Sequence, residues 1–285
     1  MAAPAALADA AVVRTAGGDE IFGVDARADQ VLLSTLRERC GPSWPGVLIM
    51  EGFDSPVEVG DPGGPWVYIA DPVDGTRPWL AGKRSAWVLL GAGLGARVLE
   101  DLSVGAAVEI PTRRARLGQV AWAAAGSPAL AVDEDLTDPG RAATAVTLTP
   151  RVSADLHRTF VTVARFSPGT KSAIGAWEDA LLAGLEVYED PWLCSGGQLM
   201  GVASGTDAAV LDPRPLLGVT LCAHPYDLAA LVVARAAGAI VEALPPGPLT
   251  VELRPDADVA WAAYANAAVA ARLRPGPDHA AAFGR

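Results

Sequence analysis

The segment DPVDGT at residues 71–76 places two carboxylates, Asp71 and Asp74, three positions apart. It directly follows residues 66–70, an apolar run that is typical of a buried strand. The proline stiffens the turn, and the glycine permits a sharp reversal of the chain. Carboxylates and backbone carbonyls, such as that of Val73, are ligands that Mg²⁺ accepts. The spacing therefore indicates either a magnesium site or a turn in which Asp and Gly serve only the backbone.

A glutamate precedes this segment at the end of another apolar run. Glu51 follows residues 47–50 and lies 20 residues before Asp71 (71 − 51 = 20). Together, Glu51 and DPVDGT resemble the metal-binding signature of the inositol monophosphatase-like family, a group of Mg²⁺-dependent, lithium-sensitive phosphatases that includes fructose-1,6-bisphosphatase and 3′(2′),5′-bisphosphate nucleotidase. The resemblance implies that two or three magnesium ions are held by Glu51, Asp71, the Val73 carbonyl and Asp74.

Four further segments resemble parts of the same family. Residues 21–25 resemble the stretch that carries the catalytic aspartate, which implies that role for Asp25, with Arg14 in place of the family's upstream lysine. Residues 224–230, HPYDLAA, resemble a diverged second signature and imply that Asp227 is another metal ligand. Downstream of residue 194, the runs SGGQL and ASGTD resemble the walls of the substrate pocket. The resemblance extends from about Arg14 to Gly238.

The implied chemistry follows from charge. A phosphate monoester dianion repels hydroxide, so metal ions must neutralise its oxygens and lower the pKa of a bound water. The resemblance implies catalytic roles for Asp25, Thr76 and Glu51, with Asp25 and Thr76 orienting and deprotonating that water. It implies a substrate-binding set of Gly75, Thr76, Arg77, Ser195, Gly196, Gly197 and Asp227.

Several positions depart from the family pattern and bear on the substrate. At position 77, Arg77 resembles the basic residue found after DGT in relatives that act on 3′-phosphoadenosine nucleotides. Its guanidinium is expected either to bind a second phosphate or to form a surface salt bridge. Gly52 stands where many relatives have a second acid, and Leu211 stands where inositol-active members often place a sugar-binding Glu. Other candidate phosphate or sugar contacts are Lys83, Arg84, Arg165 and Lys171. Charged residues of this kind more often serve only as solvated surface charges.

The leading prediction is hydrolysis of a small phosphorylated polyol or sugar by metal-activated water. The alternative enzyme is a 3′(2′),5′-bisphosphate nucleotidase, which we distinguish by whether Arg77 faces the pocket. An alternative of another class is a non-catalytic protein that binds a phosphorylated metabolite. The presence of both Asp25 and Thr76 favours an enzyme, because a binding module has no use for a pair that activates water.

Composition narrows the class of protein and its partners. The chain has 285 residues, 51% of them hydrophobic and 19% charged, which is typical of a folded globular protein. A net charge of −11 without a basic stripe argues against nucleic acid or a membrane surface as partner. The three cysteines, Cys40, Cys194 and Cys222, have no C-x-x-C spacing, so neither a disulfide framework nor a zinc cluster is expected. We expect a cytoplasmic protein.

Hydrophobic patterning predicts alternating strands and helices. The expected strands are residues 66–70, 86–90, 106–110, 160–164 and 239–244, and the expected helices are residues 4–13, 26–39, 173–184, 225–237 and one opened by 193–205. His224 is expected to start a helix rather than to act as a base. The family resemblance implies a layered α-β-α-β-α sandwich and a homodimer.

The expected organisation has two halves. An N-terminal α+β half, residues 1–150, carries most of the metal ligands, and an α/β half, residues 151–272, completes the site between them. The polar, Pro/Gly-interrupted stretch at residues 133–151 joins the two halves. Residues 273–285 are expected to form a flexible tail.

Overall fold

A computed structural model describes residues 10–16, 19–138, 140–166, 169–218 and 221–276. The largest element is an eight-stranded sheet with the order β10-β9-β8-β7-β6-β5-β3-β4. Its strands are β3 (Gly46–Met50), β4 (Val57–Val59), β5 (Trp66–Asp74), β6 (Ala86–Leu94), β7 (Val104–Ile110), β8 (Leu117–Ala124), β9 (Leu130–Asp135) and β10 (Thr144–Val146). Neighbouring strands are antiparallel except β3 and β5, which are parallel.

Both faces of this sheet are covered at its centre, which explains the continuous apolar runs of β3 and β5. Leu48 and Tyr68 pack in a cluster with Leu36 of helix α1 (Gly23–Arg39). The alternate residues, Ile49 and Ile69, pack in the main core on the opposite face. That face meets helices α4 (Ser195–Ser204) and α5 (Leu231–Ala237).

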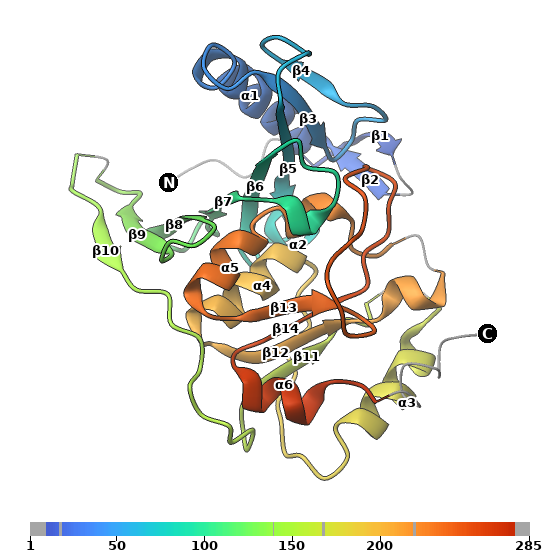
Figure 1. The fold of residues 1–285 in the computed structure, drawn as a ribbon. Helices are drawn as coiled ribbons and strands as arrows, with labels where there is room; N and C mark the ends of the chain where they lie inside the picture. The colour runs from blue at the N-terminus through green and yellow to red at the C-terminus, as the bar shows by residue number, and fades with distance from the viewer. Residues whose placement is uncertain (1–9, 17–18, 139, 167–168, 219–220, 277–285) are drawn as a thin grey trace.

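A second sheet of four strands lies on the far side of α4 and α5 (Figure 1). Its order is β11-β12-β14-β13, from β11 (Phe160–Val163), β12 (Asp207–Asp212), β14 (Trp261–Tyr264) and β13 (Ile240–Ala243). Helices α3 (Lys171–Leu181) and α6 (Ala267–Leu273) pack on its other face. The layers are therefore helix, sheet, helix pair, sheet and helix pair, and the expected α-β-α-β-α sandwich is confirmed.

Short elements complete the described chain. They are the hairpin strands β1 (Val12–Ala16) and β2 (Asp19–Phe22), the helix α2 (Thr76–Leu80), and the 3-10 helices η1 (Leu99–Asp101), η2 (Arg214–Leu217) and η3 (Pro225–Leu228). Within the described residues, no helix combines the length and the apolar character that crossing a bilayer requires.

Two helix predictions are wrong in part. The predicted helix at residues 4–13 ends in a strand instead, because the β-branched Val12 and Val13 lie in β1, which pairs with β2. Its residues 4–9 lie outside the described part of the chain. The predicted helix at 225–237 is two elements, η3 and α5, separated by Ala229 and Ala230.

Helices α2 and α6 were not predicted from the sequence, and the other predicted elements form with shifted ends. α6 begins after Asn266, whose side chain accepts hydrogen bonds from the N–H groups of Ala268 and Val269 and thereby caps the helix. The division near residue 150 stays a prediction, although the large sheet ends with β10 at Val146 and the second sheet begins with β11 at Phe160. The predicted tail begins inside α6, whose last residue, Leu273, is buried, and its residues 277–285 lie outside the description.

Candidate active site

The parallel pairing of β3 and β5 brings together the carboxylates that follow the two apolar runs. Met50 pairs with Ala70, and the N–H of Glu51 donates to the Ala70 carbonyl at 3.3 Å. Glu51 therefore lies beside Asp71 at the carboxyl end of the paired stretch of β3 and β5. The register of β5 with β6 shifts between Asp71 and Asp74, and the Val73 N–H donates to Asp71 Oδ1 at 2.9 Å within this irregular stretch.

Asp227 joins these residues from η3, which lies against β5. Ligand oxygens of Asp71, Asp74 and Asp227 all lie within 4.8 Å of one another. Burial raises the pKa of each of these carboxyl groups above its ordinary value. Repulsion adds to the rise in pKa, since Glu51 acts on Asp71 and Asp227 acts on Asp74. Crowded, buried oxygens of this kind are a donor set that fits a hard divalent cation such as Mg²⁺.

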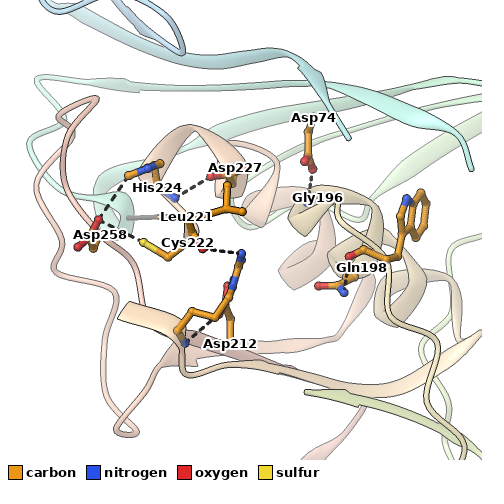
Figure 2. A network of polar contacts seen from close by, with 11 residues as sticks. Asp74, Gly196, Gln198, Asp212, Leu221, Cys222, His224, Asp227 and Asp258 are labelled. Carbon is orange, nitrogen blue, oxygen red and sulfur yellow. Dashed lines mark hydrogen bonds and ion pairs between the residues drawn. The ribbon is translucent and has the colours of Figure 1, made fainter. Parts of the chain in front are cut away.

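The start of helix α4 holds Asp74. The Gly196 N–H donates to Asp74 Oδ2 at 2.5 Å (Figure 2). The Cys194 thiol donates to the same oxygen at 3.3 Å. Both hydrogen bonds favour the ionised carboxylate and act against the rise in its pKa caused by burial. Residue 196 must be small, because a Cβ there would lie 2.3 Å from Leu89 Cδ1.

A hydroxyl and a carboxylate face each other beside this cluster. Thr76 Oγ1 lies 2.7 Å from Asp25 Oδ1 and 2.7 Å from the Val73 carbonyl oxygen. Asp25 is buried in the first turn of α1, and its second oxygen accepts the Phe22 N–H at 2.8 Å. The carboxylate is thereby held in one orientation toward Thr76.

These groups line one cleft, with an empty volume of about 570 Å³ that includes its open mouth. The predicted site residues along it are Asp25, Glu51, Asp71, Val73, Asp74, Gly75, Thr76, Arg77, Ser195 and Asp227. Gly75 has a φ of 89°, the left-handed region that favours glycine, and there it turns the chain from β5 into α2.

Gly196 and Gly197 are not among the residues that line the cleft. The Gly196 N–H binds Asp74, and the Gly197 N–H donates to Cys194 Sγ at 3.2 Å. Their predicted contact with substrate stays a prediction. In this structure the Gly196 N–H holds the Asp74 carboxylate, and the Gly197 N–H holds the Cys194 thiol that also contacts Asp74.

Arg77 lines the cleft, as binding of a second phosphate would require, and it also forms an ion pair, as its alternative interpretation as a salt-bridge residue predicted. Its guanidinium lies 3.3 Å from Glu20 Oε2 and 5.7 Å from the Phe22 ring centroid. Glu20 and Phe22 also line the cleft. The arginine is therefore held at the cleft mouth by an acidic and an aromatic neighbour.

The other candidate phosphate contacts, Lys83, Arg84, Arg165 and Lys171, do not line this cleft. Arg84 pairs with Asp190, and Arg165 pairs with Glu178 and Glu189. Arg14, the expected replacement for the family's lysine, pairs with Asp29 of α1 at 3.1 Å.

Sequence reasoning missed two residues that shape the site. Cys194 is the N-cap of α4 and contacts Asp74, and its only signal in the sequence is that it precedes the pair of glycines. Arg214 is buried in the cleft wall, where its guanidinium donates two hydrogen bonds to Asp212 and lies 4.0 Å from the Phe166 ring centroid. An arginine two positions after an aspartate gives little warning of such a pair.

No protein-family profile and no curated protein matches the chain. Solved structures do match. The extragenic suppressor protein SuhB of Bartonella henselae has a TM-score of 0.68 and 16% identity, covering 96% of this chain and 90% of that one. Inositol monophosphatase II of Staphylococcus aureus has a TM-score of 0.65 and 17% identity, covering 91% of this chain and 84% of that one. SaIMPase-II bound to 2′-AMP has a TM-score of 0.64 and 16% identity, covering 92% of this chain and 87% of that one. At these identities the likeness establishes the fold, which is that of the inositol monophosphatases.

Proposed function

We propose that this chain, which has the fold of the inositol monophosphatases, is a metal-dependent hydrolase of small phosphate monoesters. One observation carries the proposal. The buried carboxylates of Asp71, Asp74 and Asp227 converge in the same cleft as the paired Thr76 and Asp25. A metal-binding cluster beside a group that can take a proton is the arrangement that metal-assisted hydrolysis needs.

We assign five groups as ligands for two or three magnesium ions. They are the side chains of Glu51, Asp71, Asp74 and Asp227 and the carbonyl of Val73. Bound there, the ions would neutralise the phosphate oxygens and lower the pKa of a coordinated water. The cluster is acidic, so an anionic substrate depends on the ions to enter the cleft.

Thr76 and Asp25 supply the proton acceptor. When the Thr76 hydroxyl donates to Asp25, its oxygen keeps lone pairs that accept a hydrogen bond from the attacking water. The proton of that water passes to Asp25 through the Thr76 hydroxyl. The Phe22 N–H holds the Asp25 carboxylate in place during this transfer.

The substrate class that we favour is a small phosphorylated polyol or sugar. A 3′(2′),5′-bisphosphate nucleotide is the second candidate, because Arg77 lines the cleft and a guanidinium suits a second phosphate. A similar structure, SaIMPase-II, binds 2′-AMP, which is in keeping with that candidate. We further propose a homodimer without nucleic acid or membrane partners, and light scattering tests its oligomeric state.

The test is phosphate release from inositol monophosphates, sugar phosphates, fructose 1,6-bisphosphate and 3′-phosphoadenosine 5′-phosphate, with Mg²⁺ and with a chelator. We expect chelator-sensitive release from at least one compound. Arg77→Gln separates the two candidates, because it should reduce activity selectively on the bisphosphate nucleotide if the guanidinium binds the second phosphate. Glu38→Gln removes an exposed carboxylate on α1 and is the matched control.

Release that persists in the chelator would contradict the metal mechanism. If Mg²⁺ binds but no compound releases phosphate, the result would instead support a non-catalytic protein that binds a phosphorylated metabolite. The absence of both phosphate release and Mg²⁺ binding would overturn the proposed site itself.

A further inference from the structure

A second group of metal-ligating side chains lies beside the carboxylate cluster and shares none of its members. It consists of Cys222, His224 and Asp258, each of which offers one ligand atom within 4.8 Å of the others. Cys222 and His224 are buried, and the side chain of Asp258 is 46% exposed. Figure 2 shows the three side chains turned toward one another.

Backbone pairing brings these residues together from two distant segments. The Val259 N–H donates to the Ala223 carbonyl at 2.8 Å, so the loop that carries Asp258 crosses residues 222–224. Cys222 and His224 flank Ala223, and both side chains turn toward Asp258 (Figure 2). The position of the three groups therefore rests on main-chain contacts as well as on their own hydrogen bonds.

The two separations from Asp258 are close to those around a small tetrahedral ion, and the ligand atoms of Cys222 and His224 lie within 4.8 Å of each other. Asp258 Oδ1 lies 3.3 Å from Cys222 Sγ and 3.7 Å from His224 Nδ1. Zinc bonds of about 2.0 to 2.3 Å place two tetrahedral ligands about 3.3 to 3.6 Å apart. An ion can therefore enter among the three groups after small side-chain adjustments.

We propose that Cys222, His224 and Asp258 form a site for Zn²⁺ or a similar transition-metal ion, separate from the carboxylate cluster. A thiolate and an imidazole favour zinc over magnesium, whereas the all-oxygen cluster suits magnesium. The two sites therefore select different cations. Because Asp258 is half exposed, water can reach the fourth position of the ion.

Binding moves two protons. The Cys222 thiol, which now donates to Asp258, releases its proton to solvent as the sulfur binds the ion. His224 Nδ1 now lies 2.9 Å from the Ala257 carbonyl oxygen. It gives up this hydrogen bond, and the neutral ring carries its proton on Nε2.

The site connects to the cleft through one short segment. The His224 N–H donates to Asp227 Oδ2 at 2.6 Å, and Cys222 itself lines the cleft. An ion bound by Cys222 and His224 would hold this segment and with it the orientation of the Asp227 carboxylate. The competing interpretation is a metal-free hydrogen-bonded tie between the two loops, which the test below distinguishes.

Cobalt is the probe, because a thiolate bound to Co²⁺ produces a charge-transfer absorption in the near ultraviolet that an all-oxygen site lacks. The full-length protein is titrated with Co²⁺ in excess Mg²⁺, and Zn²⁺ is then added. We expect the absorption to appear with one Co²⁺ per chain and to disappear as Zn²⁺ displaces it. We expect Zn²⁺ affinity to fall at least tenfold in Asp258→Asn, which removes a direct ligand.

The cysteine variants identify the sulfur. Cys222→Ser should abolish the absorption, whereas Cys40→Ser, which changes a half-buried thiol at the C-terminal end of α1, should retain it. Circular dichroism verifies that each variant is folded. Absence of the band in the wild-type protein, or its persistence in folded Cys222→Ser, would overturn the proposal. Because the readout is spectroscopic, it does not depend on the phosphatase activity proposed above.

Discussion

Asp74 combines charge, burial and backbone support in one residue. Its carboxylate is buried among other acids, and it accepts hydrogen bonds from Gly196 and Cys194. In the metal-free protein these two hydrogen bonds offset only part of the cost of burying the charge, since the pKa of Asp74 remains raised. The residue is thus better suited to binding a cation than to stabilising the fold.

We expect Asp74→Asn to reduce kcat/KM by about a hundredfold or more, because the substitution removes one charged ligand and changes little volume. The fold should persist, and the Tm of the metal-free protein should stay equal or rise, because a buried like-charge repulsion is relieved. Steady-state kinetics and thermal denaturation measure the two effects. Activity near that of the wild type would contradict the proposed metal site.

Thr76→Val tests the proton path by removing a hydroxyl while keeping the shape of the side chain. We expect kcat to fall by about 10²- to 10⁴-fold, the usual range for general acid–base catalysis, because Asp25 loses its link to the water. Mg²⁺ binding, measured by calorimetry, should remain within a few-fold of the wild type. A variant that loses Mg²⁺ binding and activity together would assign Thr76 to the metal site instead.

Helix α4 acts as a single positioning element. Its N-terminal turn contacts Asp74 through Gly196, and its later residues Leu199 and Val202 pack in the main core. The core therefore determines where the first turn lies. The position of the helix and the geometry of the carboxylate cluster are consequently coupled.

Gly196→Ala should disturb both packing and activity. The new Cβ would meet Leu89 Cδ1 at 2.3 Å and Asp74 Oδ2 at 2.9 Å, so the Leu89 and Asp74 side chains or the start of α4 must shift. We expect a loss of about 1 to 3 kcal/mol in the free energy of unfolding, as for other overpacked cores, together with weaker Mg²⁺ binding. Gly247→Ala, where a Cβ meets no atom within 4 Å, is the control and should change neither. Equal behaviour of the two variants would contradict the role given to α4.

At the scale of the whole molecule, the cleft lies where the layers meet. Asp25 comes from the outer helix α1, Asp71 and Asp74 from the large sheet, Ser195 from the helix pair, and Asp227 from η3. No single layer contains the site. Cations bound there would consequently join several layers and stabilise the whole fold.

This arrangement predicts how stability depends on pH and metal. Burial and repulsion raise the pKa values of Asp71, Asp74 and Asp227 above the ordinary value of 3.8. Above about pH 4 the folded chain therefore binds more protons than the unfolded chain, and its free energy of unfolding should decrease as pH rises. Mg²⁺ should oppose this decrease, because it binds the ionised carboxylates. Thermal denaturation at several pH values, with Mg²⁺ or chelator, measures both effects.

The matched control for this experiment is again Asp74→Asn. With one raised carboxyl group removed, the decrease in stability with pH in chelator should be shallower than in the wild type. Identical slopes for the two proteins would show that other charges of this acidic chain cause the dependence.

The amino-acid sequence by itself determined the local framework of this protein. The strand that runs into DPVDGT and the helix after Asp25 depend on short-range patterns. The family resemblance added Glu51 and Asp227, and the structure brings both to the same cleft. These features were predictable because turn chemistry and hydrophobic periodicity act over a few residues.

Only the tertiary structure decided which distant residues meet. It broke the predicted helix at 225–237 into η3 and α5, and it placed Cys194 and Gly196 against Asp74. It also brought Asp258 to Cys222 and His224, a group that no spacing in the sequence indicates. The physical reason is that such contacts arise from the packing of layers, where main-chain pairing across the core sets each neighbour and local sequence does not.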